Sequence, residues 1–164
     1  MDERATFDLE GYVERIRSGP CFICGLVAGN RDYRHHFVYE DADSIAFLNR
    51  YTPLRGYVLV CPKAHVEQVT GDVSLEAYLA LQGVVYRVSE AVRRAMGAAR
   101  VYVLSLGSNE GNSHVHWHVA PLPHGVPLEA QQFDALDARR GVLALSDEEL
   151  GEIAGRIRAA LTHT

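Results

Sequence analysis

Three histidines alternate with apolar residues in the segment His114-Val-His-Trp-His-Val-Ala120. In a β-strand, this alternation places His114, His116 and His118 on one face and the apolar residues on the other. Successive histidines would lie ~6.6–6.8 Å apart, so one phosphate group fits between two of them. Histidines spaced in this way can also bind one metal ion. The spacing therefore predicts a nucleophile site or a metal site, and an ordinary polar strand face remains the third interpretation.

The three cysteines of the chain form one close pair, Cys21 and Cys24, and one isolated residue, Cys61. In a reducing compartment, a CxxC pair indicates a metal or redox site rather than a disulfide. Cys61 lies in an apolar run, and we interpret it as a core residue.

Length and charge limit the class of protein. The 164 residues suffice for one domain with its own core. The net charge of −5 and the absence of a basic bias argue against binding of long nucleic acid, while a small phosphorylated ligand remains compatible. The charged first residues exclude a secretory signal, and no apolar window approaches the ~20 residues of a membrane span. We expect a cytoplasmic protein without a membrane partner.

The helices and strands that position these residues can be predicted from the spacing of apolar residues. Apolar spacing predicts a helix over 8–17, a long helix over 74–96 that Gly97 ends, and a final helix that starts at Ser146, where Glu149 completes a capping box. Short runs predict strands over 36–40, 44–48, 57–61, 101–106 and 114–120. Because tight turns join several neighbours, we expect an α+β fold with a mainly antiparallel sheet.

The segment HVHWHVA resembles the signature of the histidine triad (HIT) family, in which three histidines alternate with apolar residues. The stretch from Phe47 to Pro62 also looks like this family, and its Asn-Arg pair is similar to the fragile-histidine-triad branch, which cleaves dinucleoside polyphosphates. The likeness covers residues 21–123. It divides the chain into an N-terminal helical extension (1–20), a HIT domain (21–123) and a C-terminal extension (124–164) whose final helix packs on the same domain.

This resemblance implies five antiparallel strands with two main helices, to which the terminal helices are added, and a homodimer. It also implies that His116 attacks the α-phosphorus of a nucleotide and forms a nucleotidyl-histidine intermediate. His118 would bind the phosphate or help to protonate the leaving group. Neutral imidazole suits this chemistry, because it is a good nucleophile at neutral pH.

A subset of bacterial HIT proteins closes a zinc site with residues that match four positions here. Carried over, the zinc ligands are Cys21, Cys24, His65 and His114. A closed Cys₂His₂ set is typical of a structural ion rather than a catalytic one.

The nucleotide pocket is also assigned by resemblance. Asn49 would hold the ribose and Arg50 the phosphates. The base would contact apolar side chains, namely Phe22, Ile23, Leu26 and Phe47. The family's Gly-Gln-Ser/Thr segment before the triad is replaced by Ser108-Asn-Glu-Gly-Asn-Ser113, so the glutamine is missing. Here the phosphate donors would be Asn109, Asn112 and Ser113, although a plain hairpin turn explains the same composition.

Four functional hypotheses follow. The first is a nucleotide hydrolase or nucleotidyl transferase acting on a dinucleoside polyphosphate-like substrate, which the Asn49–Arg50 pair favours. The second is a nucleoside phosphoramidate hydrolase. The third is a nucleotide-binding module without turnover, which the missing glutamine favours. The fourth is a zinc protein whose histidines all bind metal.

Overall fold

The computed structural model describes residues 3–162, so His163 lies outside the described part of the chain. Its centre is a five-stranded antiparallel sheet with the strand order β2-β3-β4-β6-β5. The strands are β2 (Phe37–Glu40), β3 (Ser44–Leu48), β4 (Val58–Pro62), β5 (Arg100–Ser105) and β6 (Trp117–Leu122). The predicted α+β class with an antiparallel sheet is confirmed.

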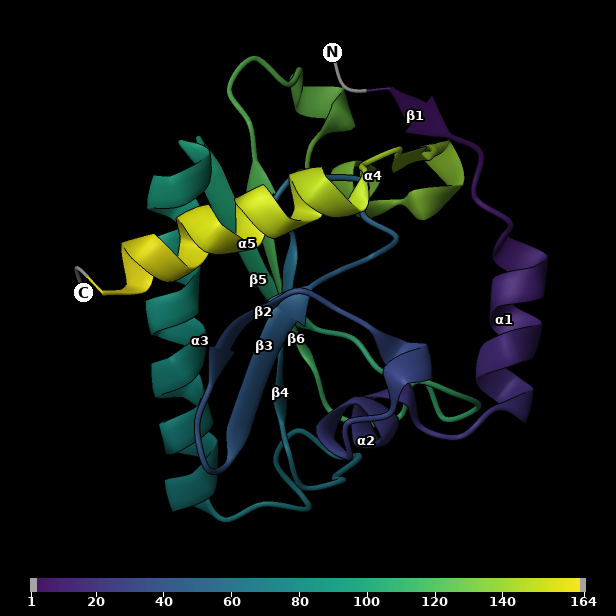
Figure 1. Cartoon of the computed structure of the whole chain (residues 1–164), viewed down its shortest axis with the longest axis vertical. Coiled ribbons are helices and arrows are strands. Elements are labelled where there is room, and N and C mark those ends of the chain that lie inside the picture. Colours follow the sequence, from purple (N-terminus) through teal and green to yellow (C-terminus); the bar gives the residue numbers. More distant parts are fainter. Residues whose placement is uncertain (1–2, 163–164) are drawn as a thin grey trace.

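Two long helices, α3 (Leu75–Met96) and α5 (Asp147–Leu161), cover one face of this sheet. Ser74 caps the start of α3, and Gly97 ends it in the left-handed conformation that a residue without a side chain adopts readily. The predicted capping box of α5 is present, because Ser146 and Glu149 exchange both hydrogen bonds. In Figure 1, α5 crosses α3 above the sheet, and their apolar stripes form the larger part of the core.

The opposite face carries the histidines and short elements. Leu59 pairs with His118 and also with Phe47 on the next strand, so these three side chains share this face. The face is covered by α2 (Phe22–Val27), the 3-10 helix η1 (Arg31–Tyr33) and α4 (Phe133–Leu136). Two further 3-10 helices, η2 (Leu128–Ala130) and η3 (Ala138–Arg140), flank α4 in the chain. Ile45, Cys61 and Ala120 complete the second core cluster, as predicted for Cys61.

Helix α1 (Leu9–Ser18) lies at the side of the molecule away from α3 (Figure 1). It matches the predicted helix, and none of its residues is fully buried. Before it, β1 (Arg4–Ala5) pairs with β7 (Val142–Leu143) in a small second sheet that the sequence pattern did not predict. This pair joins segments near the two ends of the described chain, a long-range contact without a local signal.

Two local expectations differ from the structure. The predicted strand over 114–120 is regular only from Trp117, because Val115 bonds the carbonyl of Val66 in a loop instead of a neighbouring strand. Helix α2 was not predicted, since its six residues are too few for a periodic pattern. Among the described residues, no helix is long and apolar enough to cross a membrane.

Candidate active site and metal centre

His116 is held as a neutral imidazole with one bare nitrogen. Its side chain is buried, and its Nδ1 lies 2.7 Å from the carbonyl oxygen of His114. Because a carbonyl oxygen only accepts, Nδ1 carries the proton and Nε2 keeps its lone pair. Burial lowers the pKa of His116, against the effect of this hydrogen bond. The geometry therefore presents Nε2 as a nucleophile at neutral pH.

His118 lies beside His116, with ring centroids 4.8 Å apart. The hydroxyl of Tyr57 is 2.9 Å from Nδ1 of His118. Burial raises the pKa of Tyr57, so the phenol stays protonated and is able to donate. We assign it as the donor to Nδ1. His118 then carries its proton on Nε2. Burial, followed by the neighbouring His116, lowers the pKa of His118 to about 4, which keeps this ring neutral as well.

Removal of the Tyr57 hydroxyl should allow the proton of His118 to occupy either ring nitrogen. In Tyr57→Phe, Nδ1 of His118 loses its donor, and we expect mixed tautomers and a loss of roughly 1 kcal/mol of folding stability. Imidazole ¹⁵N NMR and denaturant unfolding measure the two effects. Tyr86→Phe is the control, because Tyr86 is 67% exposed and distant in sequence from the triad. A parent protein with His118 protonated on Nδ1 would contradict the assignment.

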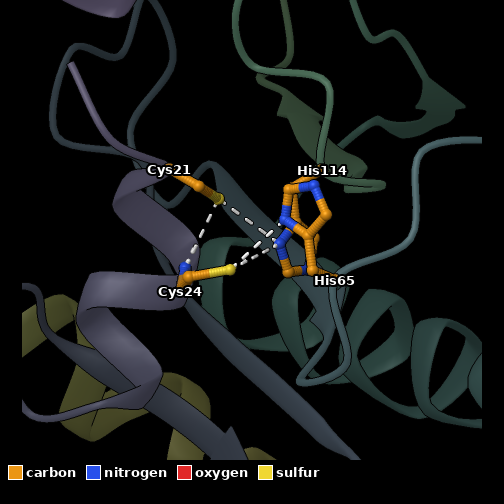
Figure 2. A group of neighbouring side chains, drawn as sticks. All are labelled: Cys21, Cys24, His65 and His114. Carbon is orange, nitrogen blue, oxygen red and sulfur yellow. Dashed lines mark hydrogen bonds between the residues drawn. The ribbon is translucent and has the colours of Figure 1, made fainter.

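The four residues carried over as zinc ligands lie together in the structure. Cys21 and Cys24 come from the start of α2, His65 from the loop after β4, and His114 from the segment before β6 (Figure 2). Their ligand atoms all lie within 4.8 Å of one another. Nδ1 of His114 is 3.5 Å from Sγ of Cys21 and 3.6 Å from Sγ of Cys24. The Sγ atom of Cys24 is also 3.3 Å from Nδ1 of His65. For tetrahedral zinc, a sulfur–nitrogen separation of about 3.5 Å follows from the usual bond lengths.

The ring nitrogens of His65 and His114 that point away from the cysteines form hydrogen bonds of the kind found at metal centres. Nε2 of His114 donates to the carbonyl of Pro62 at 2.9 Å, and Nε2 of His65 donates to Glu67 at 3.2 Å. Each ring therefore directs an unprotonated Nδ1 at the cysteines. Ligand histidines commonly have such a carbonyl or carboxylate partner. Both histidines have the tautomer that a cation at the centre of the cluster requires.

The thiols also need a cation. Burial and the neighbouring Cys21 raise the pKa of Cys24 to about 11, so without a metal this thiol is neutral at physiological pH. A bound divalent cation reverses that preference and stabilises the thiolate. The donor set of two sulfurs and two imidazoles is one that Zn²⁺ prefers.

A cavity of about 770 Å³ opens beside the metal cluster, at the upper end of the usual size of small-molecule sites. Seven of the predicted nucleotide-binding residues line it: Phe22, Ile23, Asn49, Arg50, Asn109, Asn112 and Ser113. Leu26 and Phe47 do not line it and are buried in the second core cluster, to which Ile23 also belongs with 1% of its surface exposed. Of the triad, only His114 belongs to the cavity wall, whereas His116 and His118 do not line it.

Three of the side chains predicted to bind the nucleotide already form hydrogen bonds within the protein. Asn49 accepts a hydrogen bond from the backbone of Tyr51 at 3.2 Å. Asn112 donates to the hydroxyl of Tyr12 at 3.0 Å, and Ser113 donates to Glu67 at 2.8 Å. These side chains therefore shape the wall of the cavity as well as lining it.

Sequence reasoning missed further residues of the cavity. His35, which had no assigned role, packs its ring 4.9 Å from Phe47 and 6.0 Å from Phe22, between the base-pocket aromatics. Helix α1 adds three lining residues, namely Tyr12, Arg15 and Ile16. No local signal marks either contribution, because the lining depends on which segments meet in the fold. The sequence placed Tyr57 at the start of a predicted strand, but its contact with His118 could not be predicted because the two residues are 61 positions apart.

Comparisons with known proteins agree with this geometry. The model of the HIT domain family matches residues 30–125. An uncharacterised HIT-like protein of Mycobacterium tuberculosis is 29% identical over 144 residues, which cover 84% of this chain and 90% of that protein. A similar protein of Saccharolobus solfataricus is 31% identical over 104 residues, covering 62% and 73%.

Two solved structures share the fold. A hypothetical histidine triad nucleotide-binding protein from Sulfolobus tokodaii superposes with a TM-score of 0.69 and 26% identity, covering 87% of this chain and 93% of that one. A zinc-bound histidine triad family protein from Mycobacterium smegmatis gives a TM-score of 0.64 and 26% identity, covering 87% and 94%.

Proposed function

Since this chain belongs to the HIT domain family, we propose that it is a nucleotide hydrolase or nucleotidyl transferase in which His116 attacks the α-phosphate. The observation that carries the proposal is the tautomer of His116, whose Nδ1 proton is held by the carbonyl of His114. Attack by Nε2 forms the phosphorus–nitrogen bond of a nucleotidyl-histidine and releases the leaving group. Water or another acceptor then breaks that bond. Nε2–H of His118 is the donor for a phosphate oxygen or the leaving group.

The metal in this proposal is structural zinc, held by Cys21, Cys24, His65 and His114. The separations of the ligand atoms and the zinc-bound relative support this ion. A zinc ion on Nδ1 of His114 would fix the residue whose carbonyl orients His116. The ion would thus stabilise the fold and order the nucleophile, and it takes no part in the reaction itself.

For the substrate, we propose a dinucleoside polyphosphate. Phe22 and Ile23 would contact the base, above the buried Leu26 and Phe47, and Asn49 would bind the ribose. Arg50, Asn109, Asn112 and Ser113 are the proposed phosphate contacts. The Asn49–Arg50 pair supports the polyphosphate over the alternative, a nucleoside phosphoramidate. A binding module without turnover is the second alternative, because Asn112 and Ser113 already have partners within the protein.

The test is turnover of two compounds that share the attacked nucleotide. Purified protein is incubated with diadenosine triphosphate or tetraphosphate, and in parallel with adenosine 5′-phosphoramidate, and released adenine nucleotides are separated by chromatography. We expect AMP from the diadenosine compounds. Release from the phosphoramidate alone would select that alternative. Nucleotide binding without release from either compound would select the binding module.

We further propose that the protein forms a homodimer. Leu75, Leu79 and Tyr86 make an exposed apolar stripe on α3, and Val103 on the edge strand β5 is exposed as well. Such a stripe indicates an interface. Light scattering after size-exclusion chromatography should give twice the 18.1 kDa chain mass, and Leu79→Glu should shift it to the monomer. A monomeric parent protein at micromolar concentration would contradict this.

A further inference from the structure

Helix α1 lies outside the matched HIT domain, yet it is docked on two loops of the cavity. Arg17 forms an ion pair of 2.7 Å with Glu110 in the loop before the triad. Tyr12 accepts a hydrogen bond from Asn112 in the same loop, and its ring lies 5.8 Å from that of Tyr51, next to the Asn49–Arg50 turn. The helix therefore bridges the two loops that flank the proposed phosphate site.

The backbone of the loop lies directly against this helix. Gly111 has a φ of 150°, and a Cβ atom there would lie 2.8 Å from the carbonyl oxygen of Ile16. A residue with a side chain at this position would push the loop and the helix apart. Because α1 buries no residue completely, its position depends on these contacts with the site. The helix is thus a wall of the cavity and not a loose extension.

The wall adds a cationic group to the cavity. Arg15 of α1 is exposed and lines the cavity, as does Arg50 from the turn after β3. The lining also includes two carboxylates, Asp32 and Glu110, of which Glu110 is paired with Arg17. Arg15 and Arg50 together outnumber the remaining carboxylate. The charged side chains that line the cavity therefore give a net positive lining, which favours a small anionic ligand.

We infer that Arg15, together with Arg50, forms a subsite for the phosphate groups beyond the α-phosphate. The inference rests on the proposed function, because it assumes that a nucleotide fills the cavity. The apolar side chains match the base. His114 is the triad histidine in the cavity wall, and its carbonyl holds His116, so the α-phosphate would lie at this part of the wall. The further phosphates are the remaining charged part of the ligand, and guanidinium groups bind them with paired, charge-assisted hydrogen bonds. Helix α1 then selects nucleotides with a polyphosphate chain over nucleoside monophosphates.

Calorimetric binding of two nucleotides tests this subsite. One is AMP, and the other is α,β-methylene ATP, whose bridging carbon blocks cleavage at the α-phosphate. We expect the parent to bind the ATP analogue more tightly than AMP. Arg15→Gln should weaken binding of the analogue about tenfold and change AMP binding less than about twofold. Arg15→Lys should recover part of the loss, because it restores the charge without the fork geometry.

The control is Arg34→Gln, which removes the same charge from an exposed residue that does not line the cavity. It should leave both affinities unchanged. Equal loss for both nucleotides in Arg15→Gln, no loss for either, or a parent that binds neither nucleotide would overturn the subsite. If the parent binds the ATP analogue more tightly than AMP but cleaves none of the substrates, the proposed reaction is wrong and the subsite stands. If the parent cleaves a substrate but binds the two nucleotides equally, the subsite is wrong and the reaction stands.

Discussion

Replacement of His116 by alanine should reduce kcat/KM for the cleaved nucleotide by roughly a thousandfold or more, because the covalent step loses its nucleophile. The variant loses Nε2, the atom that forms the phosphorus–nitrogen bond, and the neighbouring His118 is assigned the role of proton donor in this proposal. Initial rates of AMP release measure the effect. In the parent, quenching during turnover with an alkaline denaturant should trap AMP on the protein, since the phosphorus–nitrogen bond formed at this residue is stable in base and hydrolysed in acid.

His124→Ala is the matched control for this variant. It removes the same side chain from an exposed position outside the cavity lining and should keep parental rates. Nucleotide affinity of the His116 variant, measured by calorimetry, separates loss of chemistry from loss of binding. Parental rates in the His116 variant, or the absence of nucleotide on the quenched parent, would remove His116 from the reaction.

Loss of the metal should have the second large effect. The parent should contain one zinc ion per chain, and Cys24→Ala should contain none. Structural zinc binding contributes directly to folding free energy, so we expect a loss of more than about 3 kcal/mol. For a chain of this size, that corresponds to a melting temperature lower by about 10 °C. Elemental analysis and thermal unfolding measure the two quantities, and a chelator should lower the stability of the parent alone.

Cys61→Ala is the control for the metal variant, because Cys61 is fully buried and outside the ligand cluster. It should retain one zinc ion per chain. A stable parent without zinc would contradict the metal centre. Two or more zinc ions per chain would instead support the hypothesis that the triad histidines also bind metal.

The sequence by itself determined the elements with local signals. The apolar spacing of α3, the capping box of α5 and the short apolar run of β3 depend on residues a few positions apart, and these elements formed where they were predicted. The histidine spacing and the CxxC pair also identified chemistry-bearing residues. Their types and distances along the chain are local information, so pattern and resemblance were sufficient.

Only the tertiary structure decided how these residues act. The tautomer of His116 depends on one carbonyl, that of His118 on Tyr57 just before β4, and that of His114 on Pro62. Helix α1 was predicted, but its position on the loop before the triad was not, because Arg17 and Glu110 are 93 residues apart. Such contacts form only after distant segments meet, and for that reason the wall of the cavity has no signature in the sequence.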